Sequence, residues 1–486
     1  MHSSLHPEPN FCAQRALFRL PSTAQYCCRV VVRPVTWPRD VAAVARSLAR
    51  AEAWFWLDGS AIEPTGESGF SYLGEAAHVS HAQRGGEHEF LDSLRSEGDP
   101  GVVVALGYEF GVALIGENPA VDDEPPAFAM RPDVVLVLDH AQQRASLRGV
   151  SETAIDAWLA RHTASLHSAE PVAAREKSVP LRVGQSALQH ATGVVDSVWR
   201  RDDDRYLADV DSCKQAIHGG DAYVLCLTDT ARVDAGGVDP LQLFLLLREQ
   251  GSALRSAVIV SADRALVSAS PERFLSKRGD TIETHPIKGT RPRGETAERD
   301  RALAHALESD PKERAENLMI VDLMRNDLSR VCVPGSVRTD NFLRVEHHPR
   351  VHQLVSTVSG RLRDGLDVYD ALEACFPGGS MTGAPKRRAV QLLALLEAAP
   401  RGLYSGCFGW VDSAGDAEIA MTIRSIELRG RKGSPELALI GAGGGVTADS
   451  DAAAELAEKQ LKAAPLLAAL GVVQAEAAPE AAASDG

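Results

Sequence analysis

The chain has 486 residues, of which 44% are hydrophobic and 24% are charged, a composition typical of globular proteins with ample material for a core. Its formal net charge of -15 argues against broad binding to nucleic acid or to acidic membranes, because a phosphate-binding surface normally needs a basic excess. The eight scattered cysteines form no C-x-x-C pair, and the sequence contains neither a signal-peptide pattern nor an apolar run of about 20 residues, which favours a soluble, cytoplasmic protein that does not span a membrane.

The first 165 residues alternate strand-like and helical segments and are predicted to form an N-terminal α+β region. Residues 40–51, "DVAAVARSLARA", carry apolar side chains at helical spacing. Apolar, strand-like runs occur at "YCCRVVVRPV", "AWFWLDGS", "GFSYLG", "GVVVALGYEF" and "DVVLVLD". The chain then becomes polar and loses its periodicity, so residues 166–198 are predicted to be a linker or long loop.

A second region, residues 199–470, begins with a helix over "DDDRYLADVDSCKQAIHGGD", which is predicted to end at Gly219-Gly220 before the strand-like "AYVLCLTDTARV". Long helices are predicted from about residues 311, 385 and 450. Strands grouped apart from long helices indicate an α+β fold, since a parallel sheet would show regular βαβ alternation. Residues 471–486 contain little apolar bulk and are predicted to be a disordered tail.

Two of these helices carry paired acidic residues. In the first, Asp310 or Ser309 is a candidate N-cap, Pro311 suits the first helical position, and Glu313 and Glu316 share a face. In the second, Asp449 or Ser450 is the candidate N-cap, and the residues that share a face are Glu455, Glu458 and Lys462. Four carboxylates around one pocket would repel one another without a hard cation, and oxygen ligands favour Mg²⁺. The alternative is that both are solvated helix faces.

Two glycine-rich segments differ from nucleotide-binding motifs. In "FPGGSMTGAPKRRA", Ala384 and Pro385 separate the glycine from Lys386, so a phosphate-binding P-loop is excluded. What remains is a tight loop before a helix whose first turn is basic, a candidate carboxylate site. In "LIGAGGGVTADS", Val446 stands where a dinucleotide fingerprint needs its third glycine. The backbone N–H groups of Gly443, Gly444 and Gly445 are instead candidates for holding a carboxylate.

A lysine stands in an unusual setting at "THPIKGTRPRG", residues 284–294. Pro286, Gly289 and Pro292 restrict or bend the backbone around Lys288, and the neighbouring arginines are expected to disfavour its ammonium form. Lys288 is therefore a candidate reactive lysine, with a solvated basic loop as the alternative. Weaker candidates are a charged residue in a strand-like run, a tyrosine before a turn and a glutamate after a strand: Arg424, Tyr404 and Glu272.

Eight segments taken in order resemble the chorismate-utilising enzymes, which include anthranilate, isochorismate, salicylate and aminodeoxychorismate synthases. The resemblance covers about residues 200 to 465 and extends faintly to "FWLDGS" and "GFSYLG". The segments that carry it are "SPERFL", "PIKGTRPRG", "ENLMIVDLMRNDLSRV", "VHQLVSTVSGRL", "FPGGSMTGAPKRRA", "RGLYSGCFGWVD", "AMTIRSI" and the glycine-rich run with the helix after it. The fold that this resemblance implies is an anthranilate-synthase-like sandwich of two mainly antiparallel β-sheets flanked by helices.

Within that family, P-I-K-G-T is similar to the aminodeoxychorismate synthases, whereas anthranilate synthases usually have alanine in the place of the lysine. The resemblance implies that Lys288 attacks ring carbon 2 of chorismate while Glu272 protonates the departing hydroxyl. It also implies Mg²⁺ ligands at Glu316 and Glu458, with Glu313 and Glu455 as water-mediated or alternate ligands. The substrate contacts that it implies are Thr290, Thr382, Tyr404, Arg424, Gly443, Gly444, Gly445 and Lys462.

The implied reaction is amination of chorismate to 4-amino-4-deoxychorismate, a precursor of p-aminobenzoate and folate. No G-x-C-x-G-x-Q motif of a glutamine amidotransferase occurs, so ammonia is expected from a separate glutaminase subunit or from solution. Alternatives that remain open are anthranilate synthase component I, another chorismate aminase, and an inactive scaffold for the glutaminase. Two positions depart from the family pattern: Gln353 stands where many members have histidine, and Val224 where many have Gln or Glu.

Overall fold

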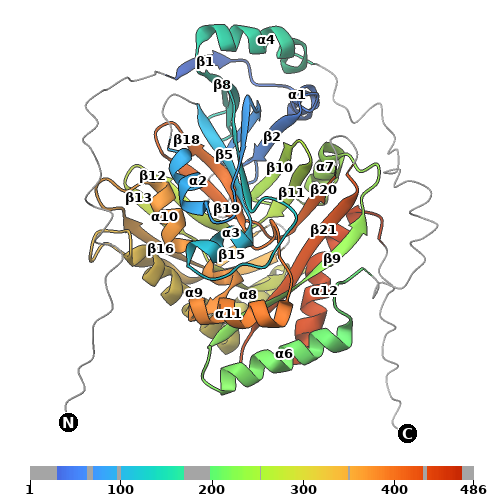
Figure 1. Cartoon of the computed structure of the whole chain (residues 1–486), viewed down its shortest axis with the longest axis vertical. Helices are drawn as coiled ribbons and strands as arrows, with labels where there is room; N and C mark the ends of the chain where they lie inside the picture. Colours follow the sequence, from blue (N-terminus) through green and yellow to red (C-terminus); the bar gives the residue numbers. More distant parts are fainter. Residues whose placement is uncertain are drawn as a thin grey trace.

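The structure is a computed structural model that describes residues 30–62, 69–95, 100–168, 198–251, 253–348, 351–430 and 435–472. Most of the predicted linker, residues 166–198, and most of the predicted tail, residues 471–486, lie outside the described residues. In the remainder, two large β-sheets pack face to face with helices around them (Figure 1).

The first sheet has eleven strands, and every pairing in it is antiparallel. Its strands in spatial order are β1 (Val31–Val35), β8 (Arg144–Gly149), β7 (Val134–Asp139), β3 (Phe70–Glu75), β2 (Ala53–Asp58), β10 (Arg255–Ser261), β11 (Arg264–Ser270), β20 (Ser425–Arg429), β21 (Leu437–Val446), β9 (Val224–Asp234) and β17 (Gly383–Ala384).

The second sheet has ten strands, and its pairings are also antiparallel. In spatial order they are β14 (Ile287–Pro292), β16 (Val351–Arg361), β13 (Thr281–Thr284), β12 (Arg273–Arg278), β19 (Ala417–Met421), β18 (Cys407–Asp412), β5 (Gly101–Leu106), β6 (Ala127–Arg131) and β4 (His78–His81), with β15 (Arg338–His347) paired to β16. The predicted α+β sandwich of two antiparallel sheets is confirmed.

Strands from the N-terminal region lie inside both sheets. In the first sheet β2 pairs with β10, so that Phe55 lies opposite Ile259. In the second sheet β5 pairs with β18, so that Val104 lies opposite Gly409. The N-terminal strands therefore complete the same two sheets that carry the residues predicted for catalysis.

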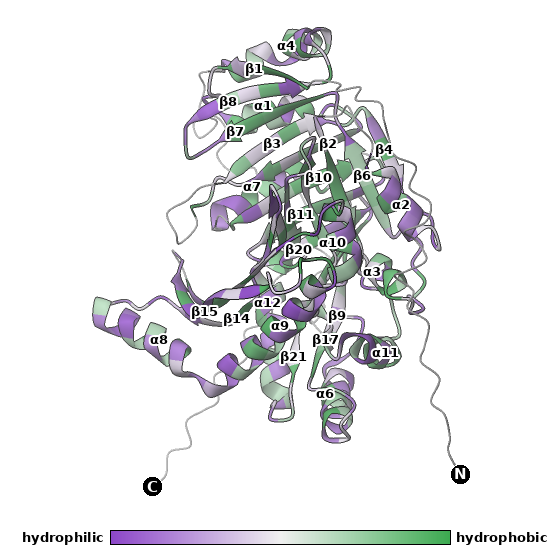
Figure 2. Ribbon diagram, turned by 90° about the vertical axis from the view of Figure 1, so that its left-hand side faces the viewer, coloured by the Kyte–Doolittle hydropathy of each residue, from purple (hydrophilic) through white to green (hydrophobic). Residues whose placement is uncertain are grey.

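The core between the sheets explains why these apolar runs form strands. Phe55, Phe128, Ile259, Phe408 and Trp410 come from both sheets and bury their side chains against one another. Strand β2 is buried on both faces, which fits its continuous run of apolar and aromatic residues. Each such side chain contributes roughly 1.5–3 kcal/mol of transfer free energy on burial. Figure 2 shows hydrophobic residues along β10, β11 and β20.

Helices cover the outer faces and both ends of the sandwich. Helices α1 (Val41–Leu48) and α4 (Glu152–Leu166) lie beside β1 and β8 at one end, and α6 (Asp203–His218), α11 (Lys386–Glu397) and α12 (Ala452–Ala469) lie towards the other end (Figure 1). The remaining helices are α2 (Glu87–Ser93), α3 (Tyr108–Leu114), α7 (Pro240–Gln250), α8 (Ala297–Ser309), α9 (Pro311–Ser329) and α10 (Val368–Cys375), with a short 3₁₀ turn, η5, at Gly379–Met381. No helix in these described ranges is long and apolar enough to cross a membrane.

The predicted helix ends agree with the structure for α6 and α9, but the predicted N-cap of α12 does not. As predicted, α6 ends at His218 with Gly219 after it, and Asp310 caps α9 by accepting the backbone N–H groups of Lys312 and Glu313. The prediction for α12 was wrong, because its N-cap is Asp451 rather than Asp449 or Ser450. The Ser450 hydroxyl is used elsewhere, since it donates to the Glu455 carboxylate at 2.7 Å.

Candidate active site

Lys288 lies on an edge strand rather than in a solvated loop. Strand β14 pairs with β16 at Ile287 and again from Thr290, and the register shifts at the two residues between them. One of these is Gly289, whose φ of +81° is a conformation that other residues rarely adopt. A Cβ atom at Gly289 would also lie 2.9 Å from a Glu313 carboxylate oxygen. The glycine therefore allows the bulge that places the Lys288 side chain.

The Lys288 ammonium group points to the glycine run of β21. A Cβ atom at Gly445 would lie 3.5 Å from Lys288 Nζ, 3.5 Å from Val224 Cγ2 and 3.9 Å from Glu316 Oε2. Cys226 pairs with Gly445 across the two strands, so its side chain belongs to the same face. The missing side chain at Gly445 thus provides the space in which Lys288, Glu316 and Val224 meet.

Strand β21 has an open edge at this point. Residues 437–446 pair with β9 along their full length, whereas β20 pairs with β21 only as far as Ile440. Within the described part of the chain, Gly443, Gly444 and Gly445 therefore have a strand neighbour on one edge only. This arrangement is compatible with their predicted role as backbone donors to an anion.

Lysines lie between the predicted metal-binding carboxylates. Lys312 Nζ is 3.8 Å from Glu316 Oε1 and 3.8 Å from Glu455 Oε1, and so connects α9 to α12. Lys462 Nζ lies 2.6 Å from Glu458 Oε1. Glu313 is held separately by Arg291, 3.1 Å away. Lys312 was not predicted as a site residue from the sequence, although its i, i+4 spacing to Glu316 is a recognisable ion-pair signal.

Burial and these lysines set the protonation of the three clustered carboxyls. Burial raises the pKa of Glu316 to about 6 and also raises the pKa of Glu455. Burial would likewise raise the pKa of Glu458, but the ammonium groups of Lys462, Lys288 and Lys312 together outweigh burial and the pKa is lowered. The cluster is thus a partly buried set of oxygen donors.

Whether this cluster suits a hard cation depends on the oxygen atoms that its carboxylates offer. In the described ranges no three acidic, histidine or cysteine side chains already stand together as a metal centre. However, Glu455 Oε2 is buried without a hydrogen-bond partner and lies 2.7 Å from where a Cβ of Gly444 would be. An unpartnered buried carboxylate oxygen, with Glu316 and Glu458 nearby, is the donor chemistry that Mg²⁺ uses.

The protonation of Lys288 differs from the expectation based on sequence. Burial alone would lower its pKa, but Cys226, Glu316, Glu272 and Glu458 outweigh burial and the pKa is raised. The neighbouring arginines do not disfavour the ammonium form: Arg291 lies 2.7 Å from Asp310, and Arg293 lies 2.8 Å from Asp300. That prediction was wrong because each guanidinium is already paired with a carboxylate.

Glu272 lies two residues after the end of β11 and is buried, so it is not a surface glutamate. Its Oε1 accepts a 2.7 Å hydrogen bond from the hydroxyl of Ser380 in the η5 turn. Burial raises the pKa of Glu272, and this effect exceeds the lowering by Ser380 and by the charges of Lys288 and Lys462. A raised pKa favours the protonated carboxyl, which is the form that a general acid requires.

Three of the predicted substrate contacts lie around β21. Tyr404 is buried with its ring against Gly441, and burial raises its pKa. Arg424, at a φ of +52°, donates to the Lys462 carbonyl at 3.2 Å, and burial lowers its pKa. Lys462 Nζ donates to the Gly443 carbonyl at 2.8 Å. These side chains form one wall of the candidate site.

The two predicted threonine contacts are placed differently. Thr290 is exposed on β14. Thr382 is fully buried, and its hydroxyl donates to the Gly378 carbonyl at 3.2 Å. Neither hydroxyl is directed to the Lys288 cluster by a contact in the described residues. His352, the histidine next to Gln353, is also buried elsewhere, with Nε2 2.9 Å from Asp300.

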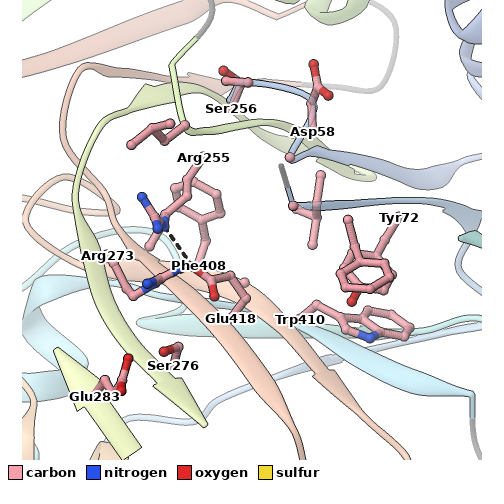
Figure 3. A pocket seen from close by; sticks show the side chains of 18 of the residues that line it. Asp58, Tyr72, Arg255, Ser256, Arg273, Ser276, Glu283, Phe408, Trp410 and Glu418 are labelled. Carbon is pink, nitrogen blue, oxygen red and sulfur yellow. Dashed lines mark hydrogen bonds and ion pairs between the residues drawn. The ribbon is translucent and has the colours of Figure 1, made fainter. Parts of the chain in front are cut away.

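A separate cavity of about 330 Å³ lies between the sheets near the N-terminal strands (Figure 3). Arg255 and Arg273 both donate to Glu418 Oε1, at 2.7 and 2.8 Å, and outweigh the effect of burial to hold the pKa of Glu418 at about 2. Tyr72 stacks on Trp410 at the side of this cavity. None of the residues predicted for catalysis lines it, so the candidate active site is the Lys288 cluster, where titratable groups from β9, β14, α9 and α12 and from the link after β11 converge.

The chain is similar to known proteins over most of its length. A family model described as chorismate binding enzyme matches residues 46–468. The aminodeoxychorismate synthase of Streptomyces griseus is 37% identical over 90% of this chain, and that of Streptomyces pristinaespiralis is 38% identical over 91%. The chain spans 64% and 65%, respectively, of the length of these two relatives. Anthranilate synthase component 1 of Arthrobacter globiformis is 42% identical over 59% of this chain and 53% of its own length.

Solved structures are similar in fold. Anthranilate synthase component I from Streptococcus pneumoniae superimposes with a TM-score of 0.69 at 24% identity, over 82% of this chain and 92% of that chain. The menaquinone-specific isochorismate synthase MenF of Escherichia coli gives a TM-score of 0.66 at 18% identity, over 91% of this chain and 94% of that chain. At these identities the similarity establishes the fold alone.

Proposed function

The chain belongs to the chorismate-binding enzyme family, and from that premise we propose that it is an aminodeoxychorismate synthase, which converts chorismate and ammonia to 4-amino-4-deoxychorismate. The observation that carries the proposal is the placement of Lys288 on the bulge of β14, with its amine over Gly445 and among Glu272, Glu316 and Glu458. Two relatives of that name, similar over about nine tenths of this chain, support the choice.

In the proposed reaction Lys288 is the nucleophile. Because its pKa is raised, the Lys288 ammonium must first lose a proton, which passes to solvent. The neutral amine then forms a bond to ring carbon 2 of chorismate as the bond from carbon 4 to the hydroxyl breaks, and Glu272 gives the departing oxygen its proton. Ammonia then forms a bond to carbon 4 and the bond between carbon 2 and Lys288 breaks, which returns the free lysine. Covalent catalysis of this kind divides one difficult displacement into two easier steps.

The same proposal assigns Mg²⁺ to Glu316, Glu455 and Glu458, with Glu313 as a more distant acidic neighbour. The unpartnered Oε2 of Glu455 and the all-oxygen donor set support this assignment. When bound, the cation would supply positive charge for the ring carboxylate of chorismate. The protein's own cations, Arg424 and Lys462, together with the backbone N–H groups of residues 443–445, would hold the second carboxylate.

Ammonia in this proposal comes from a glutamine amidotransferase outside residues 1–486, because the sequence contains no G-x-C-x-G-x-Q nucleophile motif. This source of ammonia can be tested directly. A purified glutaminase partner with glutamine should support turnover as well as ammonium salts do. Free ammonium should support turnover without that partner.

Intact-protein mass spectrometry tests the lysine mechanism. The protein is incubated with chorismate and Mg²⁺ but without ammonia, beside Lys288→Ala and Lys288→Arg. We expect an adduct on the wild-type protein that both variants lack, and 4-amino-4-deoxychorismate once ammonium is added. The Arg variant is the matched control, because it keeps the positive charge but is far less nucleophilic.

The second candidate is anthranilate synthase, favoured by the 42% identity to the Arthrobacter globiformis protein over part of the chain. Product mass and chromatographic retention separate the two activities. Anthranilate as the product, without an adduct on Lys288, would overturn the proposed function. Binding of a glutaminase without turnover of chorismate would instead indicate the non-enzymatic scaffold.

A further inference from the structure

Arg401 is a buried arginine in the turn between α11 and β18, and only 4% of its surface is exposed. Its guanidinium has five N–H groups, and five acceptors surround them. Two of the acceptors are the carboxylate oxygens of Glu397: Oε2 lies 2.8 Å from Arg401 Nε, and Oε1 lies 2.7 Å from Arg401 Nη2. The other acceptors are the Met381 carbonyl at 2.7 Å, the Cys226 carbonyl at 2.9 Å and the Ser405 hydroxyl at 3.2 Å.

Each of these last three acceptors belongs to a different wall of the candidate active site. Cys226 is the β9 residue paired with Gly445, over which Lys288 lies. Met381 follows Ser380, the residue whose hydroxyl holds Glu272. Ser405 follows Tyr404 in the chain. One side chain thus ties together three segments that are far apart in sequence.

The partners of Arg401 are themselves fixed. Glu397 Oε1 also accepts the backbone N–H of Thr228 at 2.9 Å and its hydroxyl at 3.0 Å. The Glu109 carboxylate accepts the backbone N–H of Arg401 at 2.7 Å. The guanidinium carbon lies 4.1 Å from the ring centre of Tyr108. A buried guanidinium whose five N–H groups are all hydrogen-bonded to fixed acceptors is held rigidly.

We propose that Arg401 is a positioning residue that holds the walls carrying Cys226, Ser380 and Tyr404 in register around Lys288. The inference rests on the proposed function for its catalytic consequence. Arg401 has no role in contacting substrate. Its effect is geometric, since a displacement of about 1 Å in such a site costs roughly 100-fold in rate.

The test compares Arg401→Lys with a matched variant, Arg248→Lys. Arg248 also pairs with a buried carboxylate, Asp58 at 2.6 Å, and also lies over an aromatic ring, 5.3 Å from the centre of Trp56, but it touches none of the active-site walls. We expect kcat for chorismate consumption to fall about 100-fold in the Arg401 variant, with KM changed less than about threefold, and to stay near wild type in the Arg248 variant.

Hydrogen–deuterium exchange gives a second readout that does not need turnover. Peptides covering residues 222–228, 378–384 and 401–406 should exchange faster in Arg401→Lys and at the wild-type rate in Arg248→Lys. Unchanged exchange in the first two peptides, or equal losses of kcat in the two variants, would overturn the inference. A wild-type protein that does not consume chorismate would overturn the proposed function instead, and the exchange result would still decide the role of Arg401.

Ser405→Ala covers the case in which Arg401→Lys does not fold. It removes one of the five acceptors from a fully buried position. We expect a three- to tenfold loss of kcat, on the order of one hydrogen bond, together with faster exchange in residues 401–406. Ser268→Ala is the control, because Ser268 is a buried serine in a hydroxyl pair with Ser425. Equal behaviour of the two serine variants would contradict the proposal.

Discussion

Ser380 and Glu272 show how a single hydrogen bond adjusts a buried acid. Burial raises the pKa of Glu272, while the Ser380 hydroxyl, which donates to the carboxylate, lowers it. The two effects oppose each other, so the proton affinity of Glu272 can be changed without removing the carboxyl. Substitution of Ser380 therefore tests whether Glu272 is the general acid.

Ser380→Ala should raise the pKa of Glu272 further, because the bond that favours its ionised form is lost. The general acid must be protonated, so activity falls as pH rises through this pKa, and the alkaline limb of the kcat profile should move to higher pH. A modest loss of kcat, less than about tenfold, is expected at the optimum. Glu272→Gln should abolish this limb and lower kcat by roughly 100-fold or more. An unchanged alkaline limb in Ser380→Ala would show that Glu272 is not the acid.

Two glycines of β21, Gly443 and Gly445, should respond differently to substitution by alanine. A Cβ at Gly445 meets nothing closer than 3.5 Å, so Gly445→Ala should fold normally but place a methyl group beside Lys288 and lower kcat/KM at least about tenfold. A Cβ at Gly443 would lie 2.0 Å from the Leu227 carbonyl oxygen, so Gly443→Ala should lower Tm instead. Thermal melts and steady-state kinetics on both variants check this. Full activity in Gly445→Ala would place the substrate elsewhere.

At the scale of elements, helix α3 supports the turn before β18. Glu109 is buried and accepts the backbone N–H groups of Arg401 and Gly402 at 2.7 and 3.0 Å. Burial raises its pKa from 4.5 to about 7, despite the hydrogen bond from the backbone of Arg401. An element of the N-terminal region thus carries a carboxyl that titrates near neutral pH beneath the turn that leads to Tyr404.

The pH dependence of stability follows from this shift. The unfolded chain loses the Glu109 proton near pH 4.5 and the folded protein near pH 7, so the folded state binds more protons between these values. Raising the pH through this window therefore destabilises the fold, by roughly 3 kcal/mol at most. Glu109→Gln mimics the protonated carboxyl, and we expect its Tm to match wild type near pH 5 and to exceed it near pH 8. A constant Tm difference across this range would contradict the prediction.

At the scale of the whole molecule, the two sheets are built by both halves of the chain. Strand β10 has β2 as its neighbour, and β18 has β5. The interface buries Phe55, Phe408 and Trp410 together. Residues before 169 and after 197 therefore share one core, although the sequence separates them by a long polar segment.

Two experiments test this single core. Residues 198–486 expressed alone should be insoluble or molten, because the edges and inner faces of β10 and β18 lose their partners. The 486-residue chain, cut at a protease site introduced between residues 169 and 197, should stay one particle with one cooperative melting transition. Independent folding of residues 198–486 with a wild-type Tm would refute the prediction and support a separate catalytic domain over 199–470.

Sequence alone determined those features of this protein that depend on near neighbours along the chain. Helical periodicity placed α6, α9, α11 and α12, the Asp310 cap marked the start of α9, and the spacing of Glu313, Glu316, Glu455 and Glu458 identified two acidic helices. Ordered motifs added the family, the two-sheet fold and Lys288 as the candidate nucleophile. These signals survive in a single sequence because capping and i, i+3 or i, i+4 spacing act within a few residues.

Tertiary structure alone decided which charges meet. The bridge from Lys312 to Glu455, the five acceptors of Arg401, the pairing of Arg291 and Arg293 with carboxylates, and the bond from Ser380 to Glu272 join residues up to 175 positions apart. It also decided that the N-terminal strands complete both sheets and that Asp451 caps α12. Burial and electrostatic pairing depend on distances in space, and one sequence does not specify which distant segments the fold brings together.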